Sequence, residues 1–182
     1  MKATAILMHE HEVIGQGLAV LDAVAGRLAH GESVPAPDME QLLEFFSAFA
    51  DGCHHAKEEG ILFPALEAAG LPRDGGPIGV MLHEHDEGRR LIGRLRRDIA
   101  AVGQDDEARQ RFVAAAREYV ALLKGHIAKE NQVLFPAADG MLNDADDRKI
   151  TAAFDRHEER EMGPGVHERF HRMLDELAKR YL

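Results

Sequence analysis

The sequence predicts an all-α protein: an antiparallel four-helix bundle with extra helices at its C-terminal end. Three observations lead to this prediction. Apolar residues recur with a helical period through long segments, no segment alternates apolar and polar residues as a half-buried strand would, and the segments are joined by short stretches rich in Pro and Gly. Long amphipathic helices with short connections favour antiparallel neighbours.

Length and composition agree with this class. The chain has 182 residues, of which 45% are hydrophobic, 30% charged and 5% aromatic, so it can bury a core as a soluble globular protein. The low aromatic content suits helix packing better than a strand-rich sandwich. The single cysteine, Cys53, excludes a disulfide within one chain and a zinc site built from several cysteines.

The bundle helices are expected near residues 4–29, 38–63, 77–102 and 106–135. In the first helix an apolar stripe runs from Ile14 to Leu28 in steps of three and four residues, with His11 at its head. Asp105 or Asp106 can cap the start of the fourth helix, because aspartate accepts hydrogen bonds from free backbone N–H groups there.

Two shorter helices are expected near 144–161 and 166–181. We therefore divide the chain into a bundle domain, residues 1–140, and a C-terminal helical extension, residues 141–182, packed on the bundle. The residues of the extension that can bury against the bundle are Phe154, Val166, Phe170, Leu174 and Leu177. The sequence leaves two roles open for the extension: a lid over one end of a site in the bundle, or a dimer surface.

The bundle segment contains an internal repeat. "MHEHEVIGQGLAVLD" at 8–22 is similar to "LHEHDEGRRLIGRLR" at 82–96, and each is followed by a segment with His-x-x-x-Glu and Leu-Phe-Pro. These second segments are "CHHAKEEGILFP" at 53–64 and "GHIAKENQVLFP" at 125–136. A duplicated helix–loop–helix unit suggests pseudo-twofold symmetry, which would bring the polar residues of the two copies together.

Six polar residues of the repeat are candidate metal ligands. His-x-x-x-Glu spacing places both side chains on one helix face, a turn apart, and here these pairs continue apolar stripes. Histidines and glutamates inside a bundle core are costly unless they are hydrogen-bonded, paired or bound to metal. The candidates are His11, His54, Glu58, His85, His126 and Glu130. Two ions would fit them, with both carboxylates bridging and two histidines on each ion.

The donor types indicate which metal. Imidazole with carboxylate suits iron, zinc, nickel or copper, whereas Mg²⁺ and Ca²⁺ prefer oxygen alone. A carboxylate-bridged pair of ions in a helical bundle points to iron. The Glu-x-x-His pattern of ferritin-like bundles occurs once, from Glu168 to His171, without a second copy, so this is a different kind of bundle.

These motifs resemble the hemerythrin-like (HHE cation-binding) family. The resemblance covers roughly residues 4–137, and its pieces come in order: "EHEVI" at 10–14, "HHAKEEGILFP" at 54–64, "HEHDE" at 83–87 and "HIAKENQVLFP" at 126–136. The stretches "PIGVMLHEHDE" at 77–87 and "HIAKENQVLFP" at 126–136 look especially like the iron–sulfur-repair-type di-iron members. The resemblance implies that the six candidates ligate two non-haem, carboxylate-bridged iron ions.

The sequence departs from the members that carry oxygen reversibly. Those members use a fifth histidine and an aspartate, whereas here a glutamate replaces the aspartate, and Arg89 stands four residues after His85 where a histidine would be expected. Other histidines remain open. His55 is either an additional ligand or a residue that orients Glu59, and His30 is either an additional ligand or an entrance residue. His9 and His83 are expected to face solvent.

The resemblance implies a protein that reacts with or senses a small oxidant: oxygen, peroxide or nitric oxide. The alternative is an iron- or oxygen-responsive regulatory module without turnover, so whether the protein is an enzyme stays open. The net charge of −10 argues against nucleic acid as a partner. The short apolar N-terminal run and the lack of a long apolar segment predict a cytoplasmic protein that does not bind membranes. A homo-oligomer is compatible with the sequence.

Overall fold

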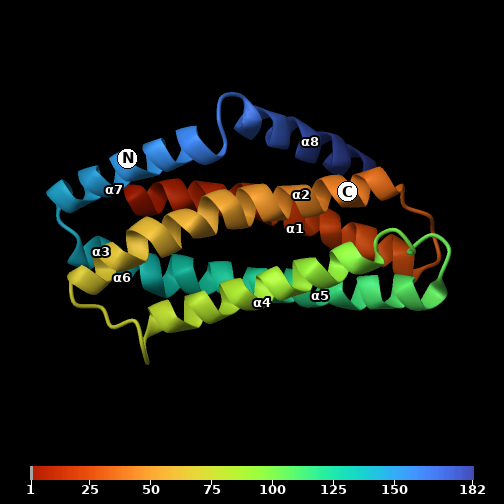
Figure 1. Cartoon of the computed structure of the whole chain (residues 1–182), viewed down its shortest axis with the longest axis horizontal. Helices are drawn as coiled ribbons and strands as arrows, with labels where there is room; N and C mark the ends of the chain where they lie inside the picture. Colours follow the sequence, from red (N-terminus) through yellow and green to blue (C-terminus); the bar gives the residue numbers. More distant parts are fainter. Residues whose placement is uncertain (1) are drawn as a thin grey trace.

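The computed structural model describes residues 2–182, and it confirms the all-α bundle with additional C-terminal helices (Figure 1). Its first and third rods are α1 (Ala3–Ala29) and α4 (Pro77–Asp98). The second rod is continuous through α2 (Ala36–Phe45), η1 (Phe46–His55), η2 (Glu58–Leu62) and α3 (Phe63–Ala68). The fourth combines α5 (Asp106–Lys129), η3 (Glu130–Leu134) and α6 (Phe135–Met141). The side chain of Asp105 caps α5 by accepting from the N–H of Glu107 at 2.9 Å.

The segments η1, η2 and η3 are wound as π-helix, which the sequence did not predict. Prolines at matching places in the repeat give a physical reason for η2 and η3. Pro64 and Pro136 follow η2 and η3 by two residues, have no N–H to donate, and crowd the carbonyl four residues before them. A wider turn relieves that crowding, and it falls on the segments that carry Glu58 and Glu130.

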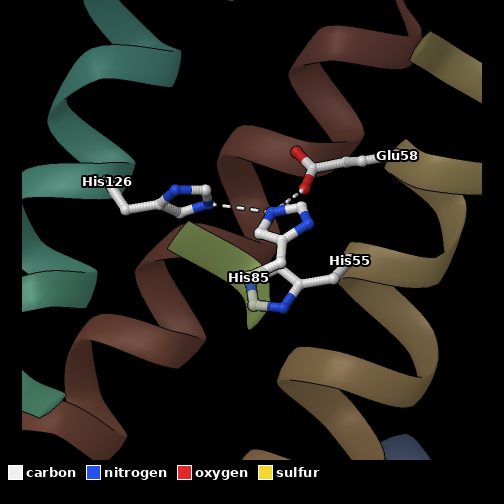
Figure 2. A group of neighbouring side chains, drawn as sticks. All are labelled: His55, Glu58, His85 and His126. Atoms are coloured by element: carbon white, nitrogen blue, oxygen red, sulfur yellow. Dashed lines mark hydrogen bonds and ion pairs between the residues drawn. The ribbon is translucent and has the colours of Figure 1, made fainter. Parts of the chain in front are cut away.

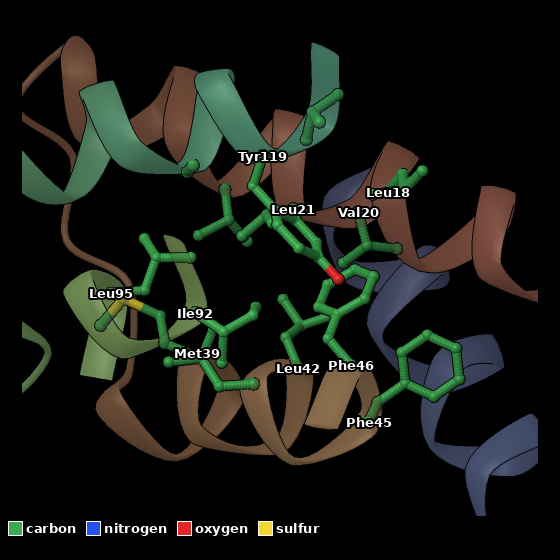
Figure 3. Packing of buried hydrophobic residues seen from close by; sticks show 14 of the residues in the cluster. Leu18, Val20, Leu21, Met39, Leu42, Phe45, Phe46, Ile92, Leu95 and Tyr119 are labelled. Carbon is green, nitrogen blue, oxygen red and sulfur yellow. The ribbon is translucent and has the colours of Figure 1, made fainter. Parts of the chain in front are cut away.

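Two apolar clusters fill the interior. The larger one lies around residues such as Leu21, Phe46 and Tyr119 (Figure 3). The smaller one lies towards α3 and α6 and includes Phe63 and Phe135. Each buried aliphatic or aromatic side chain contributes about 1.5–3 kcal/mol relative to an exposed one. This apolar packing is what can offset the cost of the polar residues buried in the same interior.

Helices α1 and α2 approach each other closely at Gly17. A Cβ atom at this position would lie only 2.6 Å from Cε1 of Phe45. Glycine is therefore required here for the ring of Phe45 to pack on α1, and this contact fixes the second rod against the first.

The C-terminal helices α7 (Asp144–Glu161) and α8 (Val166–Tyr181) lie along α1 and the second rod, on the side away from α4 and α5 (Figure 1). Phe154, Phe170, Leu174 and Leu177 are buried as expected, and Val166 is partly buried. The extension therefore covers a flank of the bundle. None of the helices within residues 2–182 has the length and apolar character that a membrane crossing needs.

Candidate metal centre

The structure brings the six predicted ligands together, and it adds His55 to them. The residues come from all four rods: His11 from α1, His54 and His55 from η1, Glu58 from η2, His85 from α4, His126 from α5 and Glu130 from η3. Each of these seven residues is at most 4% exposed. They form a polar layer enclosed by apolar side chains.

Two groups of four residues have the geometry of metal sites. Within each group, one potential ligand atom of every residue lies within 4.8 Å of the others. We name them set A, which contains His11, His54, Glu58 and Glu130, and set B, which contains His55, Glu58, His85 and His126. Figure 2 shows set B, with the side chains converging from three rods. Glu58 belongs to both sets.

The two carboxylates each face both sets. Glu58 places Oε1 3.6 Å from Nε2 of His54 and Oε2 3.4 Å from Nε2 of His85. Glu130 places Oε2 3.1 Å from Nε2 of His11 and Oε1 3.4 Å from Nε2 of His126. Two ligands about 2.1 Å from one ion are roughly 3.0–3.4 Å apart at octahedral or tetrahedral angles. The separations of 3.1 and 3.4 Å fall in this range and the 3.6 Å from Glu58 to His54 lies just above it, so the arrangement suits shared ions.

The central polar atoms lack hydrogen-bond partners. All four carboxylate oxygens of Glu58 and Glu130 are buried and unpartnered, and so is Nε2 of His55. A buried polar atom without a partner costs about 1–3 kcal/mol, and a charged one costs more. Metal cations at sets A and B would satisfy all five atoms at once. The residues therefore fit a metal centre.

Protonation equilibria in the layer point the same way. Burial lowers the pKa of His54 and of His55 well below the usual value, so both imidazoles are neutral and able to ligate. Burial, together with the negative charge of Glu130, raises the pKa of Glu58 well above its usual value. Two carboxylates in one buried layer need a cation if both are to be ionised.

The histidines are held from behind through their Nδ1 atoms. Nδ1 of His11 bonds to the amide oxygen of Asn131 at 2.8 Å, and Nδ1 of His85 to Glu59 at 2.7 Å. In the same way, Nδ1 of His54 bonds to Glu10 at 2.8 Å and Nδ1 of His126 to Glu84 at 3.0 Å. These oxygens can only accept, so Nδ1 carries the proton and each Nε2 lone pair points into the layer.

His55 is the site residue whose role the sequence left open. Its ring stacks on that of His85 with centroids 3.9 Å apart, and its Nδ1 faces Asp51 at 3.4 Å. The carboxylate of Glu59 orients His85 rather than His55, so the structure favours the ligand role. His30 bonds to the carbonyl of Gly26 at an exposed helix end and takes no part in the layer.

The sequence did not predict which residues orient the histidines. The signal for two of them was present, because Glu10 and Glu84 each directly precede a candidate histidine in equivalent places of the repeat. Glu59 and Asn131 likewise each follow a candidate glutamate. Sequence spacing places these residues beside the stripe, and only the packing of the rods shows which histidine each one reaches.

A cavity of about 220 Å³ lies beside set B. His55 and His85 line it together with Phe46, Tyr119 and Arg89. The guanidinium of Arg89 is 2.9 Å from a carboxylate oxygen of Asp51 and 2.6 Å from one of Glu59. It thus contacts the two carboxylates that face the Nδ1 atoms of His55 and His85. The cavity has room for a small molecule next to set B.

Comparison with known proteins gives a family and several relatives. The family profile of the hemerythrin HHE cation binding domain matches residues 2–138. The uncharacterized protein Rv1995 of Mycobacterium tuberculosis is 29% identical over 173 residues, which are 94% of this chain and 66% of that protein. The iron-sulfur cluster repair protein YtfE of Dickeya chrysanthemi is 38% identical over 88 residues, 47% of this chain and 40% of that protein.

A similar protein from Salmonella newport, also named iron-sulfur cluster repair protein YtfE, is 32% identical over 124 residues. The match covers 65% of this chain and 56% of that protein. The chain therefore spans two thirds or less of the length of these relatives.

Proposed function

The chain belongs to the hemerythrin HHE cation-binding domain family, and on this premise we propose that it holds two non-haem iron ions and reacts with a small oxidant. Membership of the family implies iron binding. The number of ions and the ligand set are parts of the proposal. The observation that carries it is the pair of carboxylates, each with one unpartnered oxygen towards set A and the other towards set B.

The proposed ligands divide between the two ions. Set A would supply His11 and His54, set B would supply His55, His85 and His126, and Glu58 and Glu130 would bridge. Bound iron would supply one-electron redox chemistry and a place for a small ligand. The chain's own residues keep His54 and His55 neutral through burial, orient the imidazoles through their Nδ1 atoms, and exclude bulk water from the layer.

The size of the cavity beside set B indicates the class of oxidant. The cavity beside set B, at about 220 Å³, suits dioxygen, peroxide or nitric oxide better than a large organic substrate. Three histidines at set B and two at set A would make two bound ions chemically different. We therefore place the reaction at set B, next to the cavity. Two relatives are named iron-sulfur cluster repair proteins, and we propose that this chain acts in the same context, under oxidative or nitrosative stress.

A sensing module without turnover is the second candidate. One observation favours it: Lys57, which contacts Glu10 behind His54, also lies 3.7 Å from Glu158 of α7. A change in the layer could therefore reach the C-terminal extension through a short chain of charged groups. Such a module would change its protease resistance with the oxidation state, and it would not consume oxidant.

The first test is metal content and electronic spectrum of protein from iron-supplied cells. We expect about two irons per chain in the native protein and almost none in the double variant Glu58→Gln, Glu130→Gln. The matched control is Glu12→Gln, Glu118→Gln, which changes two exposed glutamates and should keep the iron. Iron retained in the first variant would contradict the ligand assignment.

The second test separates turnover from sensing. Reduced, iron-loaded protein is mixed with peroxide or nitric oxide without air, together with an excess of an electron donor that supplies the electrons for repeated reduction. Consumption is followed over many equivalents and corrected for the mixture that contains no protein. Repeated consumption that the double variant lacks would support the reactive protein. A single stoichiometric oxidation, followed by altered protease resistance, would instead support the sensing module.

A further inference from the structure

A second cluster of potential metal ligands lies between the bundle and the C-terminal extension. Sγ of Cys53, a carboxylate oxygen of Glu158 and a ring nitrogen of His167 lie within 4.8 Å of one another. They come from η1, α7 and α8, respectively. None of the three belongs to set A or set B.

The burial of these atoms argues for a ligand among them. Cys53 is fully buried, and Nε2 of His167 is buried without a hydrogen-bond partner. That nitrogen lies 3.4 Å from Oε1 of Glu158, close to the roughly 3.4 Å that separates two ligands of one tetrahedral zinc ion. The ring of His167 also packs on Phe49, with centroids 5.1 Å apart, which fixes its position.

From this arrangement we propose that Cys53, Glu158 and His167 bind a borderline-soft divalent cation such as Zn²⁺. Thiolate, imidazole and carboxylate together suit this class, whereas Mg²⁺ and Ca²⁺ prefer oxygen alone. Three protein ligands leave a fourth position for water. The ion would tie α7 and α8 to η1, and the proposal does not depend on iron in sets A and B.

A simple ion pair between His167 and Glu158 explains less. The side chain of Glu158 is 40% exposed, and a pair that is open to water contributes about 0–1 kcal/mol. Such a pair also gives the buried thiol of Cys53, which lies beside both groups, no role. A cation accounts for all three groups.

Lys57 is the cation that would compete for this place. Its ammonium contacts Glu10, and it lies 3.7 Å from Oε2 of Glu158. The other oxygen, Oε1, is the one that faces His167. Glu158 can therefore keep Lys57 on one oxygen and offer the second to the ion.

A path for the cation is present. A surface hollow of about 590 Å³ lies against Glu158 and His167, between the end of α7 and the start of α8. Its other acidic lining residues are Asp155, Glu159 and Glu168. Carboxylates around a hollow raise the local concentration of cations, so the entrance matches the charge of the proposed ligand.

The test uses Co²⁺ added to the iron-loaded protein, residues 1–182. We expect one equivalent of Co²⁺ to bind with a thiolate-to-cobalt charge-transfer band in the near ultraviolet, and Zn²⁺ to displace it. Sets A and B contain no sulfur, so they cannot produce this band. The variant Cys53→Ala should lose it entirely.

Variants at the partly exposed ligands keep the test valid if Cys53→Ala folds poorly. His167→Ala and Glu158→Gln should each weaken Co²⁺ binding by at least about tenfold, while His171→Ala, one turn further along α8, should not. No thiolate band at saturating Co²⁺, or a band with unchanged affinity in His167→Ala, would overturn the proposal. A band that persists in Glu58→Gln, Glu130→Gln would show that this site stands even if the iron assignment fails.

Discussion

The two halves of the repeat, residues 8–64 and 82–136, use the same three-residue arrangement behind the polar layer. A glutamate on one helix accepts from Nδ1 of a histidine on the next rod and from a lysine three residues after that histidine. These groups are Glu10, His54 and Lys57 in the first half and Glu84, His126 and Lys129 in the second. The duplication therefore extends beyond the candidate ligands to the residues that orient them.

The halves differ in what covers them. Lys57 is fully buried, with its ammonium 5.6 Å from the ring centre of Phe154 on α7, whereas the side chain of Lys129 is 46% exposed. The C-terminal extension seals the first half and leaves the second half open. The same charged contact thus lies in two different dielectric environments within one molecule.

The halves also differ in what they add to the layer. His55 in the first half corresponds to Ile127 in the second, and Arg89 in the second corresponds to Gly15 in the first. Both additions act on set B, where His55 supplies a third imidazole and Arg89 contacts Asp51 and Glu59 beside the cavity. A symmetric scaffold has become an asymmetric site, with its open side at set B.

The largest effect is expected from the two lysines. Lys57→Met should lower the free energy of unfolding by about 3–5 kcal/mol, because it leaves the buried carboxylate of Glu10 without its ammonium partner. Lys129→Met removes the equivalent contact in a solvated setting and should cost less than about 1 kcal/mol. Urea unfolding of both variants measures the difference. Equal losses would mean that the extension does not set the environment of Lys57.

Much of this architecture could be predicted from the sequence. Helical stripes of apolar residues gave the rods, and the repeat gave the pairing of His54–Glu58 with His126–Glu130. These features depend on helix periodicity and on symmetry, and both can be read from spacing. The gathering of the predicted ligands in one layer follows because each histidine lies on an apolar stripe.

The asymmetry could not be predicted in the same way. His55 is offset from His54 by about 100° on a regular helix, and whether it enters the layer depends on the π-helical winding of η1. The burial of Lys57 depends on α7, which lies outside the repeat. The role of Arg89 depends on two carboxylates from another rod. Each of these is a packing outcome between distant segments.

The second largest effect is expected at His55, the imidazole that only the first half of the repeat supplies. His55→Ile makes this position match Ile127 of the other half. In the metal-free protein it should raise the free energy of unfolding by about 1–3 kcal/mol, because it removes the buried, unpartnered Nε2. The same variant should bind the set B metal at least about tenfold more weakly, if His55 is a ligand.

Unfolding of metal-free protein and metal titration together check this prediction, and His83→Gln, at an exposed histidine of α4, is the control. Stability and metal affinity should move in opposite directions. A variant that is less stable without metal, or that binds metal as well as the native protein, would contradict the assignment of His55.

The smallest effect concerns Arg89. Its guanidinium draws charge from Asp51 and Glu59, the carboxylates that face Nδ1 of His55 and His85. Without it, in Arg89→Met, those carboxylates polarise the imidazoles more strongly, so each Nε2 becomes a better donor and favours the more oxidised metal. The midpoint potential of the iron-loaded protein should then fall by tens of millivolts.

Arg90→Met, which removes a 62% exposed side chain paired with Glu87, should leave the potential unchanged. A rise in potential, or equal shifts in both variants, would mean that Arg89 only holds the surface of the cavity and does not tune set B.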